Sequence, residues 1–309
     1  MESFINSNSE TEMSRIVSPR SSAGKKAHLK LKPAITHEQK VSRFYTSGTK
    51  KRSHEAGGFL SFGYWDDKVE DYYSAAKRLL KYVLDNSGIS NPSIILNVAC
   101  GYGAETIGIF KRFKPSKIFA IDITKAHIDA ANNMMQIYPY DISFQVKNAC
   151  RTGFPESYFS HVIGIEGPAH FNTREMFIKE AYRVLKPGGC LILTDIIAQK
   201  NIYRLSPIKL QLARLCSKRW HMPYVNWIDE DGYRRLLEKA GFIVEKINII
   251  GDKVYPGFSR NNLRFRSIIN AITTRGFFTG IGLTIISWML GFLYRKHMVD
   301  YIFLRAKKR

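Results

Sequence analysis

The sequence predicts an α/β protein in which helices cover both faces of a mainly parallel sheet. Short apolar segments alternate with segments of helical periodicity along most of the chain. A glycine turn follows the first apolar segment, and an acidic residue ends the second. Strands that alternate with helices form parallel sheets, because each helix carries the chain back across the sheet. We therefore expect a seven-stranded sheet with its ligands at the carboxyl ends of the strands.

The stretch Ile94–Glu105 is the centre of this prediction. It begins with three apolar residues, as expected of a strand buried on both faces. Gly101 and Gly103 then permit a tight turn and a close approach of the backbone to a ligand. Helical spacing follows from Ala104 onward. A second apolar run ends at Asp122, where a carboxylate is placed to accept hydrogen bonds from ribose hydroxyls. The alternative for Asp122 is a cap for the next helix.

The remaining elements follow in order along the chain. Further strands are predicted at residues 117–122, 142–146, 161–166, 190–196, 242–250 and 299–304. Helices are predicted at residues 70–86, 104–113, 124–138, 172–185 and 232–240.

The composition is strongly basic. The 309 residues include 47 Lys or Arg and 26 Asp or Glu, which gives a net charge of +21. Such a balance favours polyanionic partners, namely nucleic acid, an anionic membrane surface or acidic substrates. The four cysteines are scattered, without metal-type spacing, which is typical of a reduced compartment. Residues 1–30 contain no long apolar core, so we expect no secretory signal and a cytoplasmic protein, with membrane association left open.

Domain organisation follows from shifts in composition. Residues 1–45 are polar and are expected to form a disordered basic tail, and residues 46–309 one domain. Two helical insertions, at 198–226 and 251–298, are expected either to cover a substrate as a lid or to lie on a membrane. Residues 276–294 are uncharged for a length that reaches the membrane-spanning range. A span would separate the last strand from the sheet, so a buried or surface-lying helix is favoured.

The motif at Asn97–Gly103 resembles the glycine motif of the class I S-adenosylmethionine-dependent methyltransferases, which have a Rossmann-like fold. Asn97 and Ala99 replace the usual acid and first glycine. Other similar motifs follow in the family's order: Asp122, Asn148-Ala149, Ile165-Glu166 and Leu185–Gly189. The segments Phe62–Trp65 and Glu166–Phe171 resemble the small-molecule branch, which methylates natural products and lipid-like substrates.

This resemblance implies S-adenosyl-L-methionine as cofactor and a set of binding residues. The glycine turn, from Asn97 through Ala99 to Gly103, would let the backbone run close to the methionine part of the cofactor. Asp122 would bind the ribose hydroxyls. Ile123 would flank the adenine, and Asn148, next to Ala149, either accepts from the adenine amine or is a turn residue. Residues expected to complete the site are the aromatic pair Tyr64 and Trp65, as part of a covering loop, and Glu166, which would orient a backbone or ligand group.

Acceptor activation is assigned to two residues that follow neighbouring strands. His170 titrates near neutral pH, which suits a general base for a hydroxyl acceptor. Asp195 ends the fifth predicted strand on the same edge of the sheet. In the natural-product enzymes that this chain resembles, a His and an Asp at these places assist proton removal. The alternatives are a hydrogen-bonded structural His and a cap at Asp195. No metal site is predicted, because the histidines and cysteines lie apart.

Three functions compete at this point. The first is methyl transfer to a small hydrophobic or lipid-like acceptor. The second is a nucleic-acid or protein methyltransferase, which the net charge favours. Nucleic acid is the less favoured partner, because Glu166–His170 lacks the Pro-Pro and aromatic pattern of base-amine methyltransferases. The third is a binding protein without turnover. The sequence identifies neither the acceptor, nor the atom methylated, nor the oligomeric state.

Overall fold

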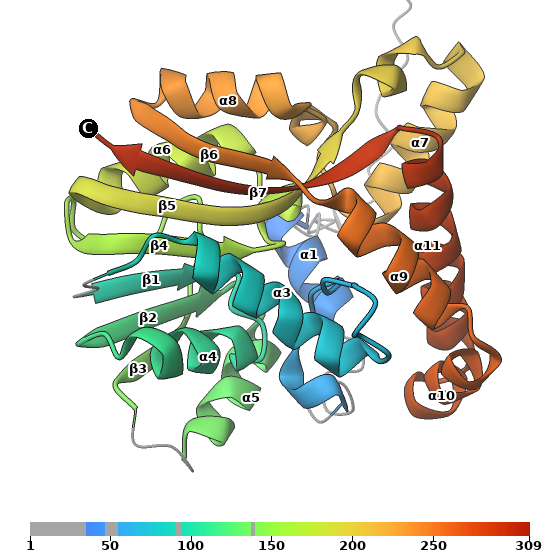
Figure 1. The fold of residues 1–309 in the computed structure, drawn as a ribbon, viewed down its shortest axis with the longest axis horizontal. Helices are drawn as coiled ribbons and strands as arrows, with labels where there is room; N and C mark the ends of the chain where they lie inside the picture. The colour runs from blue at the N-terminus through green and yellow to red at the C-terminus, as the bar shows by residue number, and fades with distance from the viewer. Residues whose placement is uncertain (1–34, 47–54, 91–93, 137–139) are drawn as a thin grey trace, which may run out of the picture. The chain divides into compact units, whose positions relative to one another are not determined.

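The computed structural model describes residues 35–46, 55–90, 94–136 and 140–309. Its centre is one seven-stranded sheet, in the order β3-β2-β1-β4-β5-β7-β6 (Figure 1). The strands are β1 (Ile94–Val98), β2 (Lys117–Asp122), β3 (Ile142–Val146), β4 (Phe159–Ile165), β5 (Leu185–Ala198), β6 (Phe242–Ile249) and β7 (Val299–Lys308). The first five pair in parallel, and β7 is antiparallel to both of its neighbours. The predicted fold class is confirmed.

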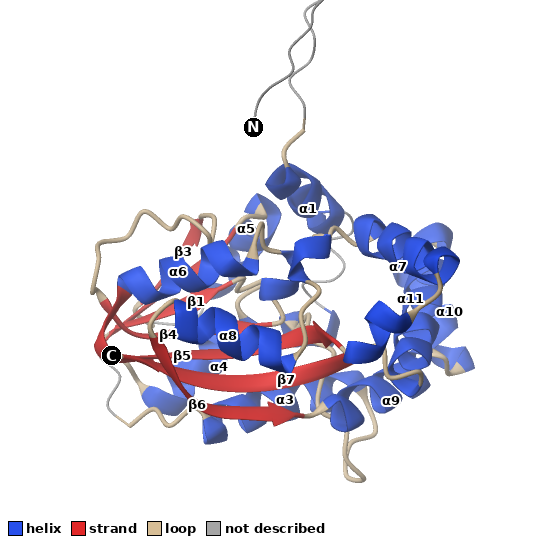
Figure 2. Ribbon diagram, turned by 90° about the horizontal axis from the view of Figure 1, so that it is seen from above, coloured by secondary structure: helices blue, strands red, loops and turns tan. Residues whose placement is uncertain are grey.

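Helices cover both faces of this sheet (Figure 2). One face packs against α3 (Tyr72–Asn86), α4 (Ala104–Phe113), α5 (Lys125–Met135) and α9 (Gly251–Asn262). The other packs against α6 (Arg174–Val184) and α8 (Glu230–Lys239). Each of these helices buries an apolar stripe, for example Leu79, Leu80 and Val83 of α3. The core therefore lies in two layers, and all the parallel strands end at one edge.

Two insertions add helices beyond this edge. The first contains the short helix η3 (Lys200–Arg204), α7 (Pro207–Arg219) and the short helix η4 (Tyr224–Asn226). The second contains α9, α10 (Phe265–Arg275) and α11 (Phe277–Arg295), and it lies in sequence between β6 and β7. A Cβ at Gly280 would lie 2.6 Å from the Ile272 nitrogen, so α10 and α11 pack backbone to backbone at this point.

Residues 37–46 differ from the expectation of a tail. They form helix α1 (His37–Thr46), which buries Val41. The low apolar content of this region led to the prediction of disorder, but one buried valine and two aromatic residues are enough to dock a short helix. The rest of the predicted tail, residues 1–34, lies outside the described residues. Short 3-10 turns at Glu55–Gly58 (η1) and Pro168–His170 (η2) complete the elements.

Candidate active site

The glycine turn after β1 lies where the sequence predicts it. The Gly101 N–H donates to Asp122 Oδ2 at 3.1 Å, and the Cys100 N–H donates to the Ile121 carbonyl at 3.1 Å. The turn needs left-handed backbone at three positions, with φ of 53° at Ala99, 52° at Gly101 and 88° at Gly103. The ends of β1 and β2 are therefore joined directly, and both belong to one site.

The two glycines serve different purposes. Gly101 lines a cavity at the strand ends, where a side chain would narrow it against Leu60, 3.1 Å from an added Cβ. Gly103 does not line this cavity. An added Cβ there would lie 2.7 Å from the Phe144 ring, so Gly103 is needed for packing of the α4 start against β3. Its predicted contact with the ligand is replaced by a packing role.

Asp122 ends β2 with its carboxylate held by the backbone. Oδ1 accepts from the Thr124 N–H at 2.7 Å, and Oδ2 accepts from Gly101. His127 Nδ1 lies 3.4 Å from the same Oδ2. The side chain remains at the cavity wall. Asp122 thus fixes the turn before α5 and also lines the cavity, and its contact with the ribose stays a prediction.

We call this space the strand-end cavity; its volume is about 150 Å³. It brings together most of the predicted binding residues, which are Ala99, Gly101, Asp122, Ile123, Asn148, Ala149, Glu166 and His170. Asn148 also fixes its own turn, because its Oδ1 accepts from the Cys150 N–H at 2.8 Å. The walls carry the carboxyl groups of Glu105, Asp122 and Glu166 together with apolar side chains, a mixture that suits a nucleoside with a charged tail.

Two of the carboxyl groups that line this cavity have raised pKa values. Burial raises the pKa of Glu166 to about 8, although its Oε1 accepts from the Phe62 N–H at 2.8 Å and the Tyr301 hydroxyl at 2.7 Å. Burial likewise raises the pKa of Glu105 to about 7. Glu105 lies in the first turn of α4, where a charged side chain normally faces solvent, so the sequence alone did not single it out. A cation in the cavity would favour the ionised form of both groups.

Helix α1 covers the cavity and contacts His170. The Tyr45 hydroxyl lies 3.0 Å from His170 Nε2, and His37 Nε2 lies 2.9 Å from the His170 carbonyl. Burial lowers the pKa of the His170 imidazole to about 4, so the ring is neutral at physiological pH. A neutral ring can accept a proton, but its basicity is weaker than the sequence argument assumed.

Asp195 lies apart from this cavity. Its Oδ2 accepts from Arg174 Nε at 2.7 Å and from the Tyr233 hydroxyl at 3.1 Å, and the carboxylate has no solvent exposure. Its other oxygen is engaged as well, because Oδ1 accepts from the Ile196 N–H at 2.8 Å. We therefore correct the prediction: Asp195 joins β5 to α6 and α8, and it does not line the strand-end cavity.

Two further predictions need the same correction. Tyr64 stacks on Tyr82, with ring centroids 5.1 Å apart, and Trp65 lies against Gly257 of α9. Neither lines the strand-end cavity; Leu60, Ser61 and Phe62 do so instead. The covering loop was placed correctly, but its contacts come from the residues just before the aromatic pair. This loop contains several large apolar side chains, and the sequence alone did not show which of them line the cavity.

Asn97 is also structural. Its side chain is buried, with Nδ2 donating to the Ile163 carbonyl at 3.1 Å and Oδ1 accepting from the Thr106 hydroxyl at 2.7 Å. It links β1, β4 and α4 behind the glycine turn. The amide does this better than a carboxylate, because it supplies both a donor and an acceptor to two fixed partners.

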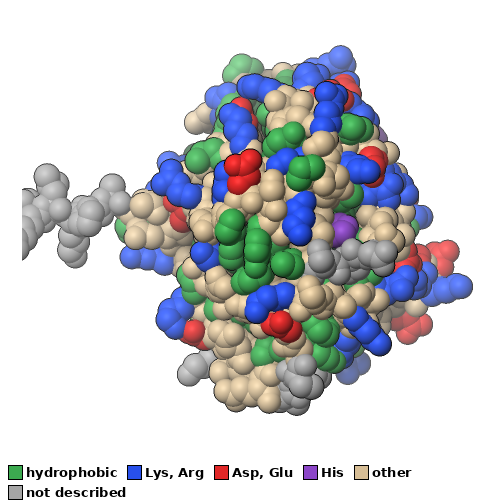
Figure 3. Space-filling view, turned by 90° about the vertical axis from the view of Figure 1, so that its left-hand side faces the viewer, with side chains coloured by type: hydrophobic (Ala, Val, Ile, Leu, Met, Phe, Trp, Pro, Cys, Tyr) green, Lys and Arg blue, Asp and Glu red, His purple; other side chains and the backbone are tan. Residues whose placement is uncertain are grey.

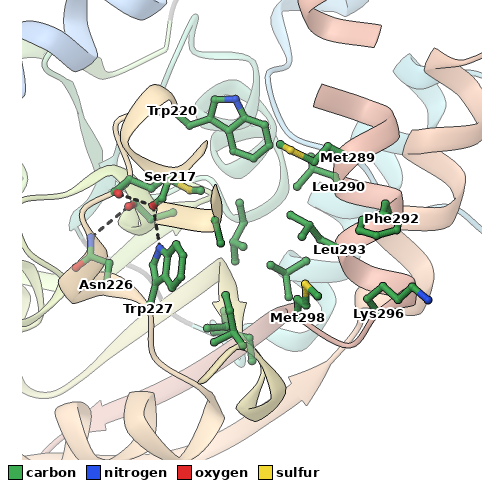
Figure 4. Close-up of a pocket in the computed structure, with 18 of the residues that line it drawn as sticks. Ser217, Trp220, Asn226, Trp227, Met289, Leu290, Phe292, Leu293, Lys296 and Met298 are labelled. Carbon is green, nitrogen blue, oxygen red and sulfur yellow. Dashed lines mark hydrogen bonds between the residues drawn. The ribbon is translucent and has the colours of Figure 1, made fainter. Parts of the chain in front are cut away.

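A second, larger space lies beside the first, and we call it the insertion cavity. Its volume is about 540 Å³, and its walls come from η2, the end of β5, the first insertion and α11. The lining is almost wholly apolar, including Trp220, Trp227, Met289 and Leu293 from opposite sides (Figure 4). Two of the polar side chains in the walls are paired: Trp227 Nε1 donates to Ser217 Oγ at 2.8 Å, and Asn226 Nδ2 donates to the Phe171 carbonyl at 2.8 Å. Ile196 lines both cavities, so they meet at the end of β5.

Comparisons with known proteins agree with this geometry. Residues 95–189 match the model of a methyltransferase domain. The chain is 29% identical over 208 residues to erythromycin 3''-O-methyltransferase of Saccharopolyspora erythraea, covering 65% of this chain and 68% of that one. It is 24% identical over 216 residues to 27-O-demethylrifamycin SV methyltransferase of Amycolatopsis mediterranei, covering 69% and 76%. A geranyl diphosphate C-methyltransferase structure from Streptomyces coelicolor shares the fold, with a TM-score of 0.70 at 15% identity over 90% of this chain and 100% of that one.

The fold and the strand-end cavity define a class I nucleotide-dependent transferase site. The matched domain at residues 95–189 and the relatives named above identify this enzyme as an S-adenosylmethionine-dependent methyltransferase (EC 2.1.1). The family predicted from the motifs is confirmed, together with S-adenosyl-L-methionine as the cofactor.

Proposed function

We propose that this enzyme transfers a methyl group to a small, hydrophobic or lipid-like acceptor held in the insertion cavity. The observation that supports this proposal is an apolar space of about 540 Å³ that meets the donor site at Ile196. Burial of apolar surface is the main source of affinity that such walls offer. An acceptor with a long polar or charged body would leave its polar groups unpaired there. The proposal is consistent with relatives whose names specify erythromycin and 27-O-demethylrifamycin SV.

The donor site is assigned to residues of the strand-end cavity. When bound, S-adenosylmethionine supplies a methyl group already activated by a positive sulfur. Asp122 would accept from the ribose hydroxyls, Gly101 leaves room beside the backbone, and Ile123 and Ala149 would flank the base. Glu105 and Glu166 would face the positive charges of the donor, which favour their ionised forms.

The protein's contribution to the rate would be alignment and exclusion of water. Holding two reactants in line contributes roughly 7–11 kcal/mol to lowering a barrier. Helix α1 and residues Leu60–Phe62 close the strand-end cavity, and the two insertions would act as the lid over the acceptor. His170 lines the donor side and directly follows Ala169, which lines the insertion cavity, so its ring is the candidate to accept a proton from a hydroxyl acceptor.

A substrate search with an internal control tests this proposal. The enzyme is supplied with methyl-labelled donor and a cell extract separated into lipid-soluble and water-soluble fractions. Label is expected in the lipid-soluble fraction, and mass spectrometry then identifies the product. Label in protein or nucleic acid would contradict the proposal. Bound donor without turnover on any fraction would instead favour a non-catalytic binder.

His170→Ala is the matching variant for proton removal. Loss of a positioned base lowers turnover by about a hundredfold or more. We expect turnover to fall while donor affinity, measured by calorimetry, changes little. Tyr45→Phe is the control, because it keeps the imidazole and removes only the hydroxyl at 3.0 Å. Equal turnover in His170→Ala and the unmodified enzyme would remove His170 from the mechanism.

A further inference from the structure

Helix α11 exposes a continuous apolar stripe. Phe278 is 89% exposed, Ile285 57% and Trp288 53%, and their spacings of seven and three residues place them on one face of the helix. The opposite face is buried and includes Gly280, Ser287, Leu290 and Gly291. An exposed row of large apolar side chains of this length on a folded domain indicates a surface that meets a nonpolar partner.

The neighbouring insertion helices expose side chains of the same kind. Phe265 of α10 is 80% exposed, and Ile208 of α7 is 84% exposed. Helix α10 packs closely on α11, so Phe265 and the α11 stripe belong to the same insertion. We call the exposed faces of α7, α10 and α11 the insertion surface (Figure 1).

The charge of the insertions indicates the chemistry of the partner. The first insertion, residues 198–226, contains six Lys or Arg and no Asp or Glu, and the second, residues 251–298, contains seven Lys or Arg and one acid, Asp252 of α9, which pairs with Lys253 at 3.3 Å. Helices α7, α10 and α11, which form the insertion surface, contain no Asp or Glu. Elsewhere the charges are mixed: in Figure 3, which faces away from the insertions, acidic side chains lie among the basic ones. A surface that is both apolar and purely cationic is complementary to anionic lipid, where side chains enter the acyl boundary and cations pair with headgroups.

The topology decides how α11 meets a bilayer. By length and composition this helix reaches the membrane-spanning range. However, it ends at Arg295, and β7 begins at Val299 between β5 and β6. The residues of β7 from Tyr301 to Leu304 have no solvent exposure. The helix cannot cross a bilayer without removing this strand from the sheet, so it would lie along the membrane surface.

The insertion cavity opens at the same place. Trp288 is half-exposed and also lines the cavity, and the exposed Lys209 of α7 and Lys296 after α11 stand at its walls. Figure 4 shows the Lys296 amino group pointing away from the cavity. We propose that the insertion surface docks in the plane of an anionic membrane, so that the insertion cavity opens toward the lipid and takes its acceptor from it. The docking is argued from the surface alone; the entry of the acceptor rests on the proposed function.

Vesicle binding by the full chain tests the docking. Sedimentation is compared for phosphatidylcholine vesicles with and without phosphatidylserine, at low salt and at about 0.5 M salt. We expect retention by the anionic vesicles and its loss at high salt. Phe278→Glu combined with Ile285→Glu should reduce retention at least about tenfold, because two anchoring side chains are replaced by charges that the leaflet repels.

The control is Ile243→Glu, which makes one substitution of the same kind at a half-exposed apolar residue of β6, outside both insertions. It should bind vesicles as the unmodified protein does. Retention that is lost with salt but unchanged in the double variant would overturn the proposal, because charge elsewhere in the chain would then account for it. A dimer in solution that the double variant converts to a monomer, with no vesicle retention in either protein, would also overturn it.

Donor calorimetry on the same variants separates this proposal from the proposed function. The double variant should bind the donor as tightly as the unmodified enzyme and keep its turnover on an acceptor dissolved in buffer. Turnover on the same acceptor embedded in anionic vesicles should fall by the factor by which retention falls. Equal turnover on embedded acceptor would show that the acceptor does not enter from the membrane.

Discussion

The strand-end cavity and the insertion cavity meet at Ile196 but are built in opposite ways. The first takes its polar groups mainly from short segments that directly follow β1, β2, β3 and β4, with some from α1, and the hydrogen bonds of the sheet hold the strand ends in place. The second takes its walls mainly from helices separated by long stretches of sequence, and its lining is apolar. The difference indicates separate roles. The strand-end cavity, which we call the donor half, binds the cofactor, and the insertion cavity, which we call the acceptor half, determines which acceptor is bound.

The largest expected effect is a loss of donor affinity, from a substitution in the donor half alone. Asp122→Ala removes a carboxylate that would bond the ribose hydroxyls and that accepts from Gly101 and Thr124. Charge-assisted hydrogen bonds contribute roughly 1.5–3 kcal/mol each, so donor affinity should fall about a hundredfold. Calorimetry measures it, and thermal unfolding distinguishes lost contacts from a loosened turn. Unchanged affinity would remove the ribose assignment.

An intermediate effect should appear in the acceptor half alone. Ala213→Phe places a ring in the insertion cavity, and its control, Gln211→Phe, adds the same ring on the exposed side of α7. We expect the acceptor KM to rise about tenfold or more in the first variant only, from lost packing volume. Donor affinity should be the same in both variants. If donor affinity falls with Ala213→Phe, the two halves are not independent.

The smallest effect concerns pH, and it belongs to the donor half. The raised pKa values of Glu105, about 7, and Glu166, about 8, mean that the empty site holds protons at neutral pH. Donor affinity should therefore rise a few-fold between about pH 6 and 9, as carboxylates form that attract a cation. Calorimetry in buffers of different ionisation enthalpy should show protons released on binding. Glu166→Gln should flatten the upper part of this rise.

The same groups give a stability change of defined sign. For Glu166 the folded pKa lies above the ordinary value of 4.5, so the folded state keeps a proton that the unfolded state has lost. The contribution is present in full below pH 4.5 and decreases as pH rises through about 8. The free energy of unfolding without donor should fall over this range, and less steeply in Glu166→Gln. An opposite slope in the difference between the two proteins would contradict the burial of this carboxyl.

The sequence was sufficient for the sheet and for the position of the strand-end cavity. The strands at residues 117–122 and 142–146 have the predicted bounds, and Gly101 and Asp122 meet as expected. These features follow from local pattern, because apolar runs define buried strands and parallel strands end at one edge. Residues that follow successive parallel strands in the sequence can therefore be predicted to lie close together in space.

What the sequence could not provide depends on contacts between distant segments. Asp195 was predicted to be catalytic because it lies near the end of β5, at the edge of the sheet where ligands bind. In the structure its carboxylate is enclosed by Arg174 and Tyr233. Helix α1 contributes Tyr45 to the site across 125 positions of sequence, and its polar composition gave no sign of this. The insertion cavity is likewise assembled from apolar residues whose spacing fits any buried helix.

The attachment of the second insertion has one further consequence. Helix α9 starts two residues after β6 ends, and α11 finishes four residues before β7 begins, so neighbouring strands hold both ends of this segment. An exchange of residues 251–298 for the corresponding segment of another enzyme should leave strand pairing and the glycine turn in place if it keeps the buried face of α9, which packs on the sheet through Val254, Tyr255 and Phe258. The second insertion is therefore the segment to exchange when a different acceptor is wanted, because the donor site lies outside it.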